Sequence, residues 1–141
     1  MYRKLTVLLL VLMSLACKND AKQGQEVNQE FKDEHNAKTS LDYVGVYEGE
    51  LPCADCEQIL YKISINEDMT FYSKYIYQGK SKEVFVEKGN YYWSENGNVI
   101  TLKSKKQTTQ FKVRENNLLM LSQGGKEIES AFQEKYVLHK S

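Results

Sequence analysis

The sequence contains little proline, histidine or cysteine, and it has no excess of charge of either sign. Its 141 residues include one proline, two histidines and three cysteines, and 19 Lys and Arg balance 19 Asp and Glu. A chain without net charge lacks the basic surface that neutralises phosphates, which argues against a nucleic-acid partner. General bases are few, and no Gly-x-Ser-x-Gly, His-Glu-x-x-His or glycine-rich phosphate-binding motif occurs. The composition therefore predicts a protein that is not an enzyme.

The long apolar run of this sequence lies at its N-terminus. Two basic residues precede a mostly apolar stretch over residues 5–13, which is too short to cross a bilayer core of about 30 Å and is typical of a secretory signal peptide. The next four residues, Ser-Leu-Ala-Cys, resemble the bacterial lipobox, in which cleavage occurs before a cysteine that becomes acylated. We therefore predict a lipoprotein signal peptide over residues 1–16 and lipidation of Cys17 with fatty acids such as palmitate. The alternative is an ordinary signal peptide with an incidental cysteine.

Lipid attachment at Cys17 is expected to hold the protein on a membrane. Each buried methylene contributes ~0.8 kcal/mol, so two or three acyl chains anchor a small domain almost permanently. Lys18, not an aspartate, follows the cysteine; by resemblance to bacterial sorting signals this favours the outer membrane, with its periplasmic or surface face left open. Ten of the 25 residues over 18–42 are charged. Such a stretch buries too little apolar surface to fold, so residues 17–42 are predicted to form a flexible tether.

From residue 43 onward, apolar residues recur at every second position, which is the period of a half-buried strand. No ten-residue helical period occurs, and about eight short strands separated by turns are typical of an antiparallel meander that closes on itself. The sequence thus predicts an all-β fold in which residues 43–141 form a small barrel. The expected strands are 44–51, 59–65, 70–77, 83–93, 98–103, 108–114, 118–122, a short piece near 126–128, and 135–139.

The interior of such a barrel is either a packed core or a ligand cavity. About eight strands enclose a space that side chains can fill or that can hold one small ligand. Seven aromatic residues are candidates for inward positions, and the sequence leaves open whether they fill the core or line a cavity. They are Tyr47, Tyr61, Phe71, Tyr75, Phe85, Trp93 and Phe111.

The most chemically informative segment is the pair Cys53 and Cys56, which lies between the first two expected strands. Pro52 ends the first strand because it cannot donate to a sheet ladder. In an oxidising envelope the two cysteines are expected to form a disulfide, which closes a short loop and contributes little to global stability. A thiol oxidoreductase site is disfavoured, because no helix follows the cysteines and the adjacent Asp55 and Glu57 disfavour a thiolate.

A metal site is the third interpretation of the cysteine pair. Two thiolates suit a soft ion such as Cu(I), whereas zinc requires four ligands and no second pair is present. The expected acylation of Cys17 removes that cysteine as a ligand. Copper is therefore the candidate cofactor, and it requires reduced cysteines. Weaker candidates for additional ligands are Met69, Met120 and His139.

The segment around the cysteine pair also resembles a known family. The run Gly45-Val-Tyr-Glu-Gly-Glu-Leu-Pro-Cys-Ala-Asp-Cys-Glu-Gln-Ile59 strongly resembles the opening of the NlpE N-terminal domain family of copper-resistance and envelope-stress lipoproteins, and residues 85–91 and 118–125 resemble its later segments. The resemblance covers most of residues 43–138. It implies a barrel related in shape to bacterial lipocalins and tethered to the outer membrane.

The resemblance also implies a class of function and of partner. Some family members activate an envelope stress response when lipoprotein trafficking or surface adhesion fails, and others are linked to copper tolerance. Stress-sensor or lipoprotein-trafficking proteins are thus the implied partners, besides the membrane. The sequence has no counterpart of the second small domain of longer members, so a signalling role that depends on that domain is not expected. A lipocalin-like carrier of a small apolar ligand is the alternative function.

Overall fold

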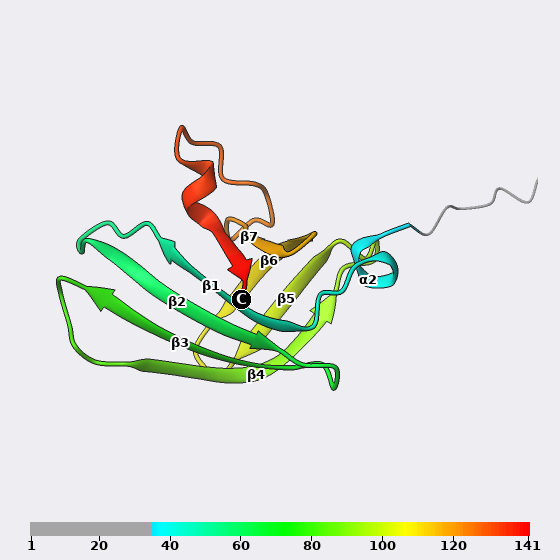
Figure 1. The fold of residues 1–141 in the computed structure, drawn as a ribbon, viewed down its shortest axis with the longest axis horizontal. Coiled ribbons are helices and arrows are strands. Elements are labelled where there is room, and N and C mark those ends of the chain that lie inside the picture. Colours follow the sequence, from blue (N-terminus) through cyan, green and yellow to red (C-terminus); the bar gives the residue numbers. More distant parts are fainter. Residues whose placement is uncertain (1–34) are drawn as a thin grey trace, which may run out of the picture. The chain divides into compact units, whose positions relative to one another are not determined.

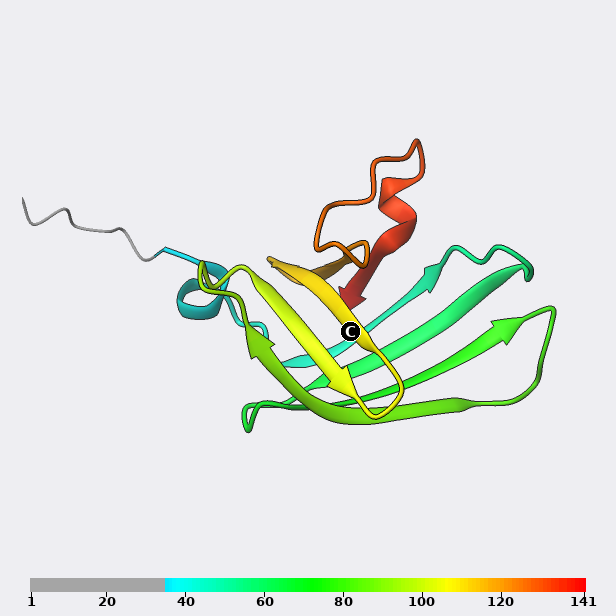
Figure 2. The same cartoon turned by 180° about the vertical axis from the view of Figure 1, so that it is seen from behind.

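Eight antiparallel strands pair in chain order and close into a barrel in the computed structural model, which describes residues 35–141 (Figure 1). The view from behind shows the same strands wrapping around one interior (Figure 2). This arrangement confirms the predicted all-β barrel. The strands are β1 (Gly45–Leu51), β2 (Gln58–Ile65), β3 (Thr70–Gln78), β4 (Phe85–Trp93), β5 (Val99–Ser104), β6 (Thr108–Arg114), β7 (Asn117–Met120) and β8 (Val137–Lys140).

The barrel closes where the last strand meets the first. β1 pairs with β2 along its whole length, but with β8 only through Tyr47 opposite Lys140 and Glu48 opposite His139. The backbone N–H of Ser141 extends this contact by donating to the carbonyl of Val46 at 3.0 Å. Within residues 35–141 every strand therefore has two neighbours, which removes a template for aggregation.

Gly89 lies where the two pairings of β4 overlap, because residues 85–90 pair with β3 and residues 89–93 pair with β5. It lies opposite Phe71 on β3 and opposite Ser104 on β5. A Cβ atom placed on Gly89 would lie 2.0 Å from the carbonyl oxygen of Lys103. Only glycine therefore allows β4 and β5 to approach this closely, which lets the sheet bend at a barrel corner.

The core consists of the side chains that alternate toward the interior. Of the seven aromatic residues predicted to point inward, Tyr47, Tyr61, Phe71 and Phe111 are buried. Tyr75, Phe85 and Trp93 are half-buried. A second, smaller cluster joins Leu119, Leu121 and Val137 on the other side of the sheet, beneath the connection between β7 and β8. The two clusters therefore cover opposite faces of the sheet at β7 and β8.

The connection between β7 and β8 differs from the sequence-based expectation. Residues 126–128 form a single bridge, Leu121 opposite Glu127, and not a strand. A turn at Gly125, which has φ of 72°, leads the chain away from the ladder. The Glu127 carboxylate instead accepts from Lys112 Nζ at 2.6 Å and from Gln133 Nε2 at 2.8 Å. The next residues form the 3-10 helix Gln133–Tyr136, so β8 begins at Val137, later than the predicted 135.

Contacts with the barrel begin before the predicted boundary at residue 43. The short helix α2 (Ala37–Ser40) packs against one barrel end, where Ala37 is buried. The backbone N–H of Ala37 donates to Asn98 Oδ1 at 3.0 Å, and that of Lys38 donates to the carbonyl of Gly97 at 3.0 Å. Residues 36–38, predicted as part of the tether, thus contact the turn between β4 and β5, while Leu41 packs on the core and Asp42 pairs with Lys140.

Residues 35–141 contain the hydrophobic core and all strand pairings of the closed barrel, so this part is expected to fold on its own. In this part of the chain, no helix has the length and apolar character needed to cross a bilayer. The predicted signal peptide, the lipidation of Cys17 and the tether up to residue 34 lie outside the described residues.

Candidate functional site

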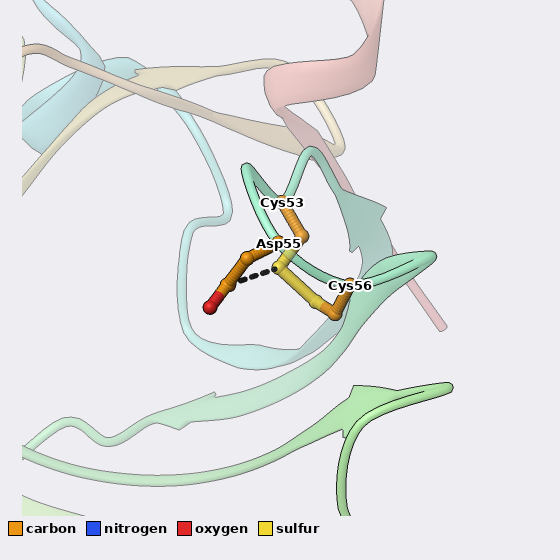
Figure 3. Close-up of side chains that lie close together, drawn as sticks. All are labelled: Cys53, Asp55 and Cys56. Atoms are coloured by element: carbon orange, nitrogen blue, oxygen red, sulfur yellow. Dashed lines mark hydrogen bonds between the residues drawn. A yellow bond between two sulfur atoms is a disulfide. The ribbon is translucent and has the colours of Figure 1, made fainter.

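Residues 52–57 connect β1 to β2 at the barrel end opposite α2. In this loop Cys53 and Cys56 form a disulfide with their Cα atoms 5.3 Å apart (Figure 3). The chain turns here because Pro52 cannot donate to the β1 ladder. It joins the sheet again where the Glu57 N–H donates to the carbonyl of Gln78, at the end of β3, at 3.0 Å. The structure thus has the expected disulfide at the predicted position.

The loop is attached to the loop that follows β3. Lys80 forms an ion pair with Asp55. Lys80 also donates a hydrogen bond to Asp55. This bond and the positive charge of Lys80 hold the pKa of the Asp55 carboxyl below its ordinary value. Nearby, Gln58 Nε2 donates to Gln78 Oε1 at 2.9 Å. Two loops that are far apart in sequence therefore form one rim of the barrel.

Each sulfur of the disulfide has a polar neighbour. Cys53 Sγ lies 3.7 Å from Asp55 Oδ1, as the dashed line in Figure 3 shows, and Cys56 Sγ lies 3.5 Å from the carbonyl of Gln58. A sulfur in a disulfide carries no hydrogen. Each contact can therefore become an S–H···O hydrogen bond only after reduction of the pair to thiols.

The same three residues form a potential metal site. The sulfurs of Cys53 and Cys56 and a carboxylate oxygen of Asp55 all lie within 4.8 Å of one another. Oxidised sulfurs are poor ligands, so these residues fit a metal only in the reduced state. Two thiolates then match the preference of a soft ion such as Cu(I), with Asp55 as a nearby hard donor.

The weaker metal candidates are not brought to this loop. Met69 lies at the turn between β2 and β3, which is the opposite end of β2 from Cys56. His139 is exposed on β8, opposite Glu48 of β1. Met120 lines a cavity that Pro52, the first residue of the loop, also lines.

That cavity, of about 690 Å³, opens beside the disulfide loop. Of the seven candidate aromatic residues, Tyr61 and Tyr75 line this cavity. Tyr47, Phe71 and Phe111 belong to the packed core. Trp93 packs edge to face on Tyr43 at the other end of the barrel, with ring centroids 4.7 Å apart. The apolar part of the cavity lining consists of Leu51, Pro52, Ile59, Met120 and Leu121 together with the rings of Tyr61, Tyr75, Tyr77 and Tyr136.

Glu87 is a buried carboxylate beneath this cavity that the sequence analysis missed. It is 7% exposed, and its Oε1 accepts from the hydroxyl of Tyr75 and from Nε2 of Gln107, both at 3.0 Å. Burial and the hydrogen bond to Glu87 raise the pKa of Tyr75 well above its usual range. The signal was present in the sequence, since Glu87 shares the inward phase of β4 with Tyr91, the phase predicted for Phe85 and Trp93.

Aromatic rings stack next to this carboxylate. Tyr75 stacks on Tyr61 and on Phe85, with centroid distances of 5.7 and 5.3 Å. Burial raises the pKa of Tyr61, the neighbouring Ser73 hydroxyl partly offsets this rise, and the negative charge of Glu87 adds to it. The cavity thus has an aromatic wall and a negatively charged group below it.

The sequence profile of the NlpE N-terminal domain matches residues 47–131, which include the disulfide loop and most of the barrel. The chain belongs to the NlpE N-terminal domain family. This finding confirms the resemblance noted from residues 45–59. A comparison with curated protein sequences gave no match.

Two solved structures support membership of the NlpE family. A lipoprotein from Shewanella oneidensis is 38% identical, with a TM-score of 0.70 over 76% of this chain and 96% of that chain. The Cpx pathway activator NlpE from Escherichia coli is 28% identical, with a TM-score of 0.53 over 62% of this chain and 47% of that chain. This chain therefore matches about half of the E. coli protein. Together these relatives indicate a cell-envelope lipoprotein.

Proposed function

We propose that this NlpE-family protein is a non-enzymatic lipoprotein of the outer membrane, anchored through Cys17, that takes part in copper homeostasis or envelope stress sensing. The observation that carries the copper role is the convergence of Cys53, Asp55 and Cys56 within 4.8 Å on a loop at the barrel rim. A rim loop can exchange ions and reductants with its surroundings without unfolding the barrel.

The redox state of the pair decides whether this loop binds copper. In the disulfide form the sulfurs of Cys53 and Cys56 are bonded to each other. Reduction provides two thiolates three residues apart, which is a ligand set that Cu(I) accepts at low coordination number. The ion pair between Lys80 and Asp55 does not involve the cysteines, so the loop retains one attachment to the neighbouring rim when the disulfide opens.

Copper binding can be tested on residues 35–141. Intact mass after alkylation, with and without reductant, reports the redox state of Cys53 and Cys56. The reduced protein is then titrated with Cu(I) against a competing chelator, with the Cys53→Ser/Cys56→Ser variant as control. We expect one Cu(I) per reduced chain and none for the control. Equal copper retention by both proteins would show that the loop is a structural element only.

The lipid anchor can be tested in cells. Cys17→Ala should release the protein from the membrane fraction, because acylation of that cysteine is the proposed attachment. Fractionation of inner and outer membranes shows where the unaltered protein resides. A Cys17→Ala variant that still sediments with membranes would contradict the anchor.

The stress-sensing role rests on the likeness to E. coli NlpE, which is a Cpx pathway activator. An envelope stress sensor or a lipoprotein-trafficking protein is the proposed partner. Overproduction of the full chain should then induce an envelope stress reporter. The matched control is the Cys17→Ala variant. If only the anchored protein induces the reporter, the signal is not a general effect of overproduction.

A lipocalin-like carrier is the second candidate function, and the cavity of about 690 Å³ at the barrel mouth favours it. Cavities of this size accommodate small ligands. A neutral fluorescent probe such as N-phenyl-1-naphthylamine should bind saturably to residues 35–141 and be displaced by the natural ligand class. Absence of saturable binding by any apolar probe would eliminate this function.

A further inference from the structure

The carboxylate of Glu87 lies inside the barrel without a cation beside it. The ion pairs of the described residues involve other carboxylates, and both hydrogen bonds to Glu87, from Tyr75 and Gln107, end on Oε1. Its second oxygen, Oε2, accepts no hydrogen bond from residues 35–141. Oε2 is not one of the buried side-chain atoms without a partner in this part of the chain, so it is open to solvent and can accept a further donor. A cation there would pair a carboxylate that is hydrogen-bonded on one oxygen only.

Ser73 is a second buried polar residue next to Glu87. It lies directly opposite Glu87 in the pairing of β3 with β4, and it is fully buried. Its Oγ makes no hydrogen bond of acceptable geometry within the part of the chain that the structure describes. Ser73 points to the same side of β3 as Phe71, a core residue. The Ser73 hydroxyl, which has the Tyr61 phenol as a neighbour, thus faces the barrel interior on the strand opposite Glu87.

Gln107 separates these groups from the cavity. It is an exposed residue just before β6, yet its side chain reaches inward, lines the cavity and donates to Glu87. Its amide is a neutral donor at a position where a positively charged donor would bind a carboxylate more strongly. An exposed side chain can also move aside without disturbing the core.

We propose that the barrel mouth binds an amphiphile with an apolar chain and a protonated amine, whose ammonium group takes the place of Gln107 at Glu87. This ligand class deepens the carrier function above and rests on it. The ammonium group donates to Glu87 and Ser73, while the apolar chain lies against Leu51, Ile59 and Met120 at the mouth.

The same geometry selects against anionic amphiphiles. A fatty-acid carboxylate placed at Glu87 would bring two negative charges together in a region of low dielectric constant, which is strongly unfavourable. The cavity is therefore expected to prefer an amine over a carboxylic acid of the same chain length.

Octylamine, octanol and octanoate at neutral pH form a matched set of probes for residues 35–141. They share one apolar chain and differ in the charge of the head group, and each is soluble as a monomer at titration concentrations. Calorimetric titration should give one site for octylamine, weaker binding of octanol and the weakest for octanoate. This comparison uses the unaltered protein, so it does not depend on the folding of any variant.

Two substitutions locate the ammonium group. Glu87→Gln keeps the shape of the side chain and an acceptor for Tyr75, but it removes the charge, and it should weaken octylamine binding at least about tenfold while sparing octanol. Glu83→Gln, an equal charge change at an exposed site, is the control. Gln107→Ala removes the competing donor and should tighten octylamine binding. Near-UV circular dichroism confirms that each variant keeps the native packing.

The outcomes separate the ligand class from the carrier function. Saturable binding of octanol or octanoate that equals or exceeds that of octylamine would leave a carrier but overturn the amine. No binding of any probe would overturn both. Octylamine binding that is unchanged in Glu87→Gln, or weakened in Gln107→Ala, would place the amine elsewhere and refute the role of Glu87.

Discussion

Lys80 and Asp55 form an ion pair that joins the disulfide loop to the loop following β3. Both side chains are more than half exposed, at 52% and 67%. Exposed ion pairs contribute little to global stability because water and salt screen them. The role of this pair is therefore local, since it orients the loop that carries Cys53 and Cys56 and sets the charge beside the sulfurs.

The first prediction concerns the titration of Asp55. Lys80 favours the ionised carboxylate, so the folded pKa lies below the unfolded value. The small contribution of the pair to stability is thus present above the unfolded pKa and is lost as the pH falls through the folded one. Lys80→Gln should raise the pKa of Asp55, measured by NMR titration. Lys62→Gln, which breaks the exposed pair with Glu48 instead, should leave it unchanged.

The second prediction concerns the disulfide. Cys53→Ser/Cys56→Ser should leave the barrel folded and lower its free energy of unfolding by about 2 kcal/mol or less, because the closed loop contains only about four residues. Thermal unfolding followed by circular dichroism measures this difference. A cooperative loss of the fold in the double variant would mean that the disulfide holds the barrel itself together.

The third prediction concerns the corner at Gly89. Gly89→Ala places a Cβ atom 2.0 Å from the Lys103 carbonyl oxygen, so the two strands must move apart. We expect a loss of about 2 kcal/mol or more in the free energy of unfolding. Gly124→Ala is the matched control, because the nearest atom to its Cβ would be Ser122 Oγ at 4.0 Å. Equal stability of the two variants in urea unfolding would contradict a role of Gly89 in bending the sheet.

The fourth prediction concerns pH and the phenol of Tyr47. This hydroxyl donates to the carbonyl of Tyr43 at 2.7 Å, and burial raises the pKa of Tyr47 to about 12. Because the folded pKa exceeds the unfolded value of 10.0, the stabilisation is complete below the unfolded pKa and is lost as the pH rises toward the folded one.

Tyr47→Phe should therefore cost about 1 kcal/mol at neutral pH, and its stability should decline less than that of the unaltered protein between pH 10 and about 12. Urea unfolding across this range provides the comparison. Tyr92→Phe, at an exposed site, should follow the unaltered protein. A parallel decline of the Tyr47→Phe variant would show that another tyrosine dominates the alkaline loss.

The fifth prediction concerns the segment before β1. Residues 43–141 alone should be less stable than residues 35–141 by about 2 kcal/mol, because Ala37 and Leu41 pack on the core. Asn98→Ala should destabilise the longer fragment more than the shorter one, since Asn98 Oδ1 accepts from Ala37. Equal effects in both fragments would show that the hydrogen bond from Ala37 to Asn98 does not contribute to stability, and equal stability of the two fragments would show the same for the whole segment.

The strands and the disulfide loop could be predicted because their signals are local. Ile59, Tyr61, Ile63 and Ile65 alternate with period two, and the alternation specifies which face of β2 is buried. Pro52 ends β1 by its chemistry alone. The strand predicted near residues 126–128 was wrong, because contacts with residues far from this segment decide its structure. Its pattern allows a strand, but the pairing of Glu127 with Lys112 and Gln133 competes with the ladder.

The polar group in the barrel could not be predicted as a unit, because its members come from different strands. Ser73, Glu87 and Gln107 are each unremarkable polar residues in sequence. Only strand register places Ser73 opposite Glu87, and only the curvature of the sheet over β4, β5 and β6 brings the Gln107 amide to Glu87. Likewise, the spacing of Cys53 and Cys56 left a disulfide and a metal site open, and the loop geometry showed the disulfide.

The sequence by itself determined the strand periodicity, the turn positions and the family, because these depend on neighbouring residues and on backbone chemistry. The tertiary structure alone decided which aromatic residues pack in the core and which line the cavity, and that a charged residue lies beneath it. Those properties depend on burial and on distances between strands far apart in the chain. They are fixed only when β1 and β8 pair and the barrel closes.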